Sequence, residues 1–186
     1  MNSKQFIETT TQDFESIIDD VINVVNGLSQ LTMNLPEAEG KWSMLQCIKH
    51  ISLATGVYVK NVEGKLSSNS NQEDSGKFKG SWKGRLFAKM NAPKPNGDIP
   101  NKLKTFKFME PSQELNREEV IDEFITVHQK FITLIKQSAS IDLDKSRVQT
   151  ALPVVKLRLG DAYLFLLAHT KRHVVQLKRI KTTVLS

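Results

Sequence analysis

The chain has 186 residues, of which 39% are hydrophobic and 25% are charged, as in an ordinary soluble globular protein. This length favours one domain, residues 1–186, and no apolar run approaches the ~20 residues that span a bilayer. The N-terminal sequence MNSKQFIETTTQDFES lacks the apolar stretch of a secretory signal, and the single cysteine, Cys47, cannot form an internal disulfide. We therefore expect a cytoplasmic protein without a membrane partner.

The net charge of +6 is concentrated in one segment. Residues 67–110 contain nine Lys or Arg against four Asp or Glu, whereas the rest of the chain is nearly balanced. This excess favours an anionic partner near the segment, with a solvated surface loop as the alternative.

Two helices are predicted in the first third of the chain. Over residues 3–26, apolar side chains recur at steps of three and four, which is typical of one buried helix face. Over residues 43–66, Ser43 and Gln46 have the spacing of a capping box, with Trp42 and Cys47 at the staple positions. The polar stretch SSNSNQEDSG, residues 67–76, then predicts a mobile loop.

Two further helices are predicted in the second half. Asn116 and Glu119 form a second capping-box pattern at the start of a helix over residues 116–138. After the sequence LRLGD, Asp161 is the expected N-cap of a helix over residues 161–183. No repeat and no sustained strand alternation is present, so we predict an all-α bundle of four helices. Nearly 50 residues separate the second and third helices, which allows a crossover connection with a short helix in residues 80–90.

Histidines mark a candidate metal site. His169 and His173 lie one turn apart on the inward face of the last helix, so their rings can converge on one ion, although such pairs also occur as structural residues. His50 lies on the apolar face of the second helix and can complete a site of three ligands with an open position. His128 also lies on an apolar face and is interpreted as a core histidine or a nearby polar group, with a metal ligand as the less favoured alternative.

Two other residues near these histidines allow more than one interpretation. Cys47, one turn before His50, is an alternative ligand. Gln176 follows His173 on the same face, where it can support the His173 ring from behind or form part of a polar rim.

The sequences KWSMLQCIKHI and LGDAYLFLLAHTKRHVVQLKRI resemble the corresponding helices of the DinB-like (DNA-damage-inducible, YfiT-like) family. The resemblance implies an up-down-down-up four-helix bundle with a long crossover between helices two and three. It also implies a divalent metal, commonly nickel or zinc, bound by His50, His169 and His173. The family's name implies a bacterial stress response.

Relatives in this family include transferases that use bacillithiol or another small thiol, so the leading functional hypothesis is a metal-dependent thiol S-transferase acting on a small electrophile. A metal-dependent hydrolase and a non-catalytic metal-binding bundle are the alternatives. A nucleic-acid binder is less favoured, although Lys, Arg and aromatic residues alternate in the crossover. The sequence also allows a homodimer.

Overall fold

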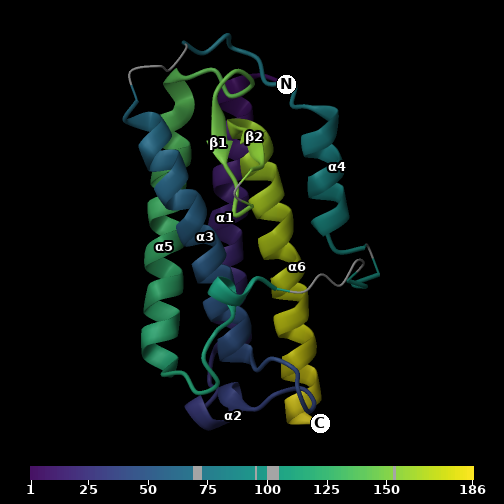
Figure 1. The fold of residues 1–186 in the computed structure, drawn as a ribbon. Coiled ribbons are helices and arrows are strands. Elements are labelled where there is room, and N and C mark those ends of the chain that lie inside the picture. Colours follow the sequence, from purple (N-terminus) through teal and green to yellow (C-terminus); the bar gives the residue numbers. More distant parts are fainter. Residues whose placement is uncertain (69–72, 95, 100–104, 153) are drawn as a thin grey trace.

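A computed structural model of the chain describes residues 1–68, 73–94, 96–99, 105–152 and 154–186. Within these residues, long helices pack side by side (Figure 1). Their bounds are α1 Ser3–Val25, α3 Met44–Leu66, α5 Arg117–Gln137 and α6 Leu159–Leu185. The predicted helical fold is confirmed, and each of these helices begins and ends within two residues of its predicted bounds. In this part of the chain no helix is both long and apolar enough to cross a membrane.

The core lies between these helices, because each buries one apolar stripe. α1 and α3 both pack against α5 and α6. Phe131 joins three of the helices, since its ring meets Phe14 of α1 edge-on at 5.2 Å and Tyr163 of α6 at 5.6 Å between centroids. All three side chains are fully buried. Burial of each such side chain stabilises the fold by roughly 1.5–3 kcal/mol.

Two helix starts carry the predicted caps. Ser43 Oγ accepts the Gln46 N–H at 3.2 Å, and Gln46 Oε1 accepts the Ser43 N–H at 2.9 Å, so the first capping box is present. Asn116 Oδ1 accepts the Glu119 N–H at 3.1 Å, which forms one half of the second box. These side chains satisfy backbone donors that the helix itself leaves free.

The prediction that Asp161 caps the last helix is wrong. α6 begins two residues earlier, at Leu159, and its N-cap residue makes no side-chain cap. The buried Asp161 carboxylate instead accepts the Ser81 N–H at 3.1 Å and the Ser81 hydroxyl at 2.6 Å. Ser81 in turn caps α4, Trp82–Asn91, by accepting the Gly84 N–H. Asp161 therefore fastens the crossover to α6, and α4 lies beside α6 (Figure 1) as the predicted short helix.

The loop predicted over residues 67–76 falls partly on residues 69–72, which lie outside the described residues. Its described end is anchored to the bundle: the Asp74 N–H donates to the Ser140 carbonyl at 3.2 Å, and the Ser3 N–H donates to the Gly76 carbonyl at 3.3 Å. Phe78 follows and is buried, with its ring centroid 4.1 Å from that of Phe6. The crossover thus continues toward α4 from a fixed point.

The sequence analysis did not predict several short elements. The strands β1, Arg147–Gln149, and β2, Lys156–Arg158, pair antiparallel and lead directly into α6. Each strand has three residues, too few for an alternating pattern to be read from the sequence. The other short elements are the helix α2, Gln30–Asn34, and the 3-10 turns η1, Lys107–Met109, and η2, Ser138–Ser140. The β hairpin and η1 help to enclose the groove between α3 and α6.

Candidate metal centre

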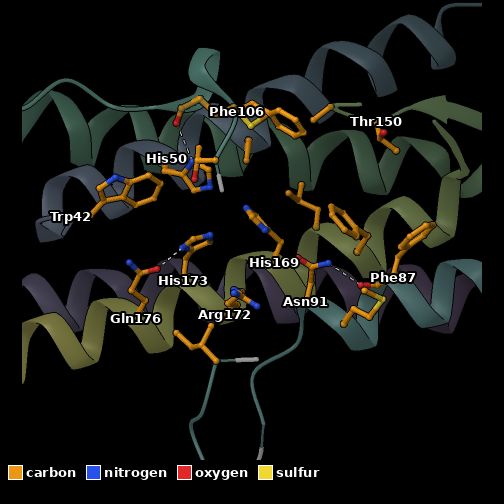
Figure 2. A pocket seen from close by; sticks show the side chains of 18 of the residues that line it. Trp42, His50, Phe87, Asn91, Phe106, Thr150, His169, Arg172, His173 and Gln176 are labelled. Atoms are coloured by element: carbon orange, nitrogen blue, oxygen red, sulfur yellow. Dashed lines mark hydrogen bonds between the residues drawn. The ribbon is translucent and has the colours of Figure 1, made fainter. Parts of the chain in front are cut away.

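The side chains of His50, His169 and His173 converge between α3 and α6 (Figure 2). Their ring centroids are separated by 5.4 Å for His50 and His169, 4.7 Å for His50 and His173, and 4.6 Å for the pair on α6. One ring nitrogen from each residue lies within 4.8 Å of the other two. The structure therefore brings together the three residues singled out in the sequence, in an arrangement that can hold one metal ion.

Hydrogen bonds orient two of the rings. His50 Nδ1 lies 3.1 Å from the carbonyl oxygen of Met109, and His173 Nδ1 lies 3.0 Å from Oε1 of Gln176. A carbonyl oxygen only accepts, so each Nδ1 carries the proton and donates it. The lone pair then resides on Nε2, which is the form of imidazole that binds a metal.

Burial keeps these histidines neutral. Desolvation lowers the pKa of His50, lowers that of His169 to about 3, and lowers that of His173 well below its ordinary value. The charge that each protonated ring would place beside the others lowers the pKa of His169 and His173 further. Three unprotonated imidazoles are available at neutral pH, as metal binding requires.

His128 lies apart from this cluster, inside the core. Its Nδ1 donates to the Phe124 carbonyl at 2.8 Å, so its Nε2 accepts from the Thr55 hydroxyl at 3.3 Å. Burial lowers the pKa of His128 to about 4. Both ring nitrogens are satisfied without a metal, which agrees with the interpretation as a core histidine.

Cys47 contacts the centre from behind. Its thiol donates to the His173 carbonyl at 3.5 Å, and its sulfur lies 3.9 Å from His173 Nδ1, the nitrogen that faces Gln176. The side chain is fully buried, and burial raises the pKa of its thiol. Cys47 therefore packs behind the His173 ring rather than beside its ligand nitrogen, and the structure gives no support to Cys47 as a ligand.

A cavity of about 620 Å³ opens in front of the histidines. It lies between α3 and α6 and is bordered by α4, η1 and the β hairpin. Figure 2 shows Trp42 and Gln176 on one side of the histidines, and Phe87 and Thr150 on the other. The volume is in the range of small-molecule sites, which are commonly about 300–1,000 Å³.

Several parts of this site were missed in the sequence. The Trp42 ring lies 4.8 Å from that of His50 and stacks at 6.4 Å on that of His173. The carbonyl of Met109 reaches His50 from a segment 59 residues away. A backbone carbonyl has no sequence pattern, so only the fold could reveal it. Arg172 and Arg179 also line the cavity. Their helical spacing from His169 is the pattern from which the sequence could have predicted this.

The basic crossover was expected to supply positive charge for an anionic partner, but its described cavity-lining residues do not. Residues from it that line the cavity, over the described part of the chain, are uncharged: Phe87, Met90, Asn91, Ile99, Thr105, Phe106 and Met109. Lys102 and Lys104 lie outside the described residues. The described lysines of the crossover therefore do not supply charge to the cavity wall.

Together, the packed helices and the histidine cluster define a helical bundle with a candidate metal centre. The family model for the DinB superfamily matches residues 13–177, a range that includes all three converging histidines. The chain belongs to the DinB superfamily. No curated protein and no solved structure matches it significantly.

Proposed function

We propose that this protein is a metal-dependent thiol S-transferase, which joins a low-molecular-weight thiol to a small electrophile. The observation that carries the proposal is the convergence of three neutral histidines on one cavity. Membership of the DinB superfamily supports a metal-dependent function.

The residues present fit a divalent metal, for which nickel or zinc is the proposed identity. His50, His169 and His173 would hold it, because their rings are unprotonated and two of them are oriented through Nδ1. When bound, such an ion would favour the thiolate form of a coordinating thiol. A set of three protein ligands leaves room for that substrate.

In this proposal the nucleophile is the substrate thiolate; the described cavity lining contains no cysteine and no serine. In the proposed reaction, the thiol proton passes to solvent and the sulfur electron pair forms a bond to the electrophilic carbon. The bond from that carbon to its leaving atom breaks, and the leaving atom takes the electron pair. A haloaromatic releases halide, whereas the oxygen of an epoxide stays in the product and takes a proton from solvent. The chain orients the two substrates and excludes water through its apolar walls.

Hydrolysis is less well supported, because it needs a general base near the attacking water. Glu37 is the carboxylate among the described lining residues, and both of its oxygens accept from Arg179, at 2.8 and 2.9 Å. Nucleic-acid binding stays the less favoured alternative: Phe78 is buried and Phe87 and Phe106 line the cavity, whereas Trp82 and Phe108 are exposed.

The remaining parts of the proposal have two sources: the resemblance supports the thiol, the stress response and the helix order, and the length and composition of the chain support one domain and a cytoplasmic location. The thiol is bacillithiol or another small thiol, and the protein acts in the cytoplasm in a bacterial stress response. Residues 1–186 form one domain, whose long helices run up-down-down-up. A non-catalytic metal-binding bundle is the outcome that remains if no reaction is found.

The test is a screen of biological thiols against a haloaromatic and an epoxide, with protein loaded with nickel or zinc. We expect turnover that disappears with a chelator and in His173→Ala, and returns on adding metal only to the wild type. A fully metallated protein without any rate above the uncatalysed reaction would count against transfer. If the wild-type protein stays metal-free after incubation with either ion, the proposal of a metal site is wrong.

A further inference from the structure

The two sides of the cavity differ in polarity. Charged side chains begin beside His173 and continue toward the C-terminal end of α6: they are Arg172, Arg179, Lys41 and Glu37. Glu37 is paired with Arg179 in a bidentate contact. The described lining of this side, the charged arm of the cavity, has three cationic side chains and one carboxylate, so its net charge is positive.

The opposite side is mostly apolar, with Thr150 as a polar residue on it. It extends from His169 toward the N-terminal end of α6 and is lined by Ala54, Tyr58, Phe87, Met90, Phe106, Leu152, Val155, Leu157, Phe165 and Leu166. Over the described residues, this side, the apolar arm, has no charged side chain. The two arms together follow α6 from Phe165 to Arg179, about 21 Å at ~1.5 Å per residue.

We infer that the two substrates bind on opposite sides of the histidines: an anionic thiol in the charged arm, and an electrophile with an alkyl or aryl group in the apolar arm. This inference rests on the proposed function and names its substrate classes. An anionic group is attracted by the net positive charge of the charged arm but would lose its hydration among the apolar side chains. An alkyl or aryl group gains free energy when the apolar side chains cover it.

The arrangement also explains how the reacting atoms meet. His169 and His173 lie where the arms join (Figure 2), so the thiol sulfur and the electrophilic carbon both reach the same point. The S–C bond forms there while the leaving group takes the electron pair from its carbon. Because the two substrates bind from opposite sides, neither substrate occupies both arms of the cavity.

The apolar arm is tested first without turnover, by calorimetric titration of metal-free protein with primary alkanols of increasing chain length. Affinity should rise up to about fourfold per methylene until the arm is filled. Ala54→Phe should shorten the series, because Ala54 lines the arm one turn from His50. Phe87→Ala should weaken binding of the longer alkanols, whereas its neighbour Leu86→Ala, which is exposed and does not line the cavity, should not.

The charged arm is tested by steady-state kinetics with mercaptosuccinate, an anionic thiol, and mercaptoethanol, a neutral one. Lys41→Gln should raise KM for mercaptosuccinate several-fold and leave KM for mercaptoethanol nearly unchanged. Lys60→Gln, on α3 and outside the cavity lining, is the control for net charge. Metal content of every variant is measured in parallel.

The two proposals fail in different ways. If alkanol affinity depends on chain length and Ala54→Phe shortens the series, but no thiol is turned over, the apolar arm is supported and thiol transfer is not. If transfer occurs, while alkanol affinity is independent of chain length and Lys41→Gln affects both thiols equally, the division into two arms is overturned.

Discussion

His173 and Gln176, one turn apart on α6, are joined through Nδ1 and Oε1 at 3.0 Å. The hydrogen bond holds the His173 ring in the tautomer whose Nε2 has a free lone pair. Of the two interpretations of Gln176 from the sequence, support from behind the ring is the one that this contact favours. The Met109 carbonyl orients the His50 ring in the same way.

Removing this contact should weaken metal binding. Gln176→Leu is expected to lower the affinity for nickel or zinc roughly 10–100-fold, because the ring is no longer held in the binding orientation. Gln176→Glu retains an acceptor and should keep an affinity close to that of the wild type. The measurement is a competition titration against a chromogenic chelator. Gln129→Leu, at an exposed site on α5, is the matched control, and equal affinities of Gln176→Leu and wild type would contradict the assigned role.

Each converging histidine should matter far more than the fourth histidine. His50→Ala, His169→Ala and His173→Ala should each reduce metal content strongly, because two ligands hold a divalent ion less well than three. His128→Ala should leave metal content nearly intact, since both of its ring nitrogens are bonded within the core. Elemental analysis after dialysis measures this, and loss of metal in His128→Ala protein that remains folded would argue against the assignment.

At Gly84, the packing of α4 against α6 leaves no room for a side chain. A Cβ built on Gly84 would overlap the side chain of Asp161, which is itself fixed by Ser81. Gly84→Ala should therefore lower the free energy of unfolding by roughly 1–3 kcal/mol. In contrast, Gly64→Ala on α3 meets no atom and should raise it by about 0.5–1 kcal/mol. Urea unfolding measures both, and a Gly84→Ala protein as stable as wild type would mean that α4 packs less closely.

The long helices could be predicted because periodic apolar stripes and caps are local properties of the sequence. Ser43 and Gln46 show this, since both halves of their capping box are only three residues apart. Asp161 shows the limit: local spacing suggested a cap, but its partner Ser81 lies 80 residues away. A contact of that separation depends on where the crossover folds back, which the helix pattern does not contain.

The candidate site likewise has a part that local sequence spacing predicts and a part that depends on how the helices pack. His169 and His173 share a helix, so their proximity follows from spacing alone. The closeness of His50 depends on how α3 packs against α6, and the sequence indicated it through the apolar surroundings of His50 and the family resemblance. The charge of the cavity was misjudged because net charge was read along the chain. Arg172 and Lys41 face the cavity, whereas the described crossover lysines do not line it.

The burial of His128 should make the fold sensitive to acid. Its pKa falls from the ordinary 6.5 to about 4 in the folded state, because burial disfavours the charged ring. Between these pH values the unfolded chain binds a proton at this residue and the folded chain does not, so stability is lost as the pH falls. The loss from His128 should reach about 3 kcal/mol near the lower end of the window, and should be absent above the ordinary pKa.

His128→Gln isolates this contribution. Glutamine does not titrate, so the variant should lose less stability than the wild type as the pH falls from 6.5 to about 4. At neutral pH the variant should be the less stable protein, because the hydrogen bonds to Phe124 and Thr55 are altered. The difference between the two proteins should therefore narrow in acid. Both are measured metal-free by urea unfolding at several pH values, so that His50, His169 and His173 contribute equally to each. Parallel curves for the two proteins across this window would show that His128 does not carry the acid sensitivity.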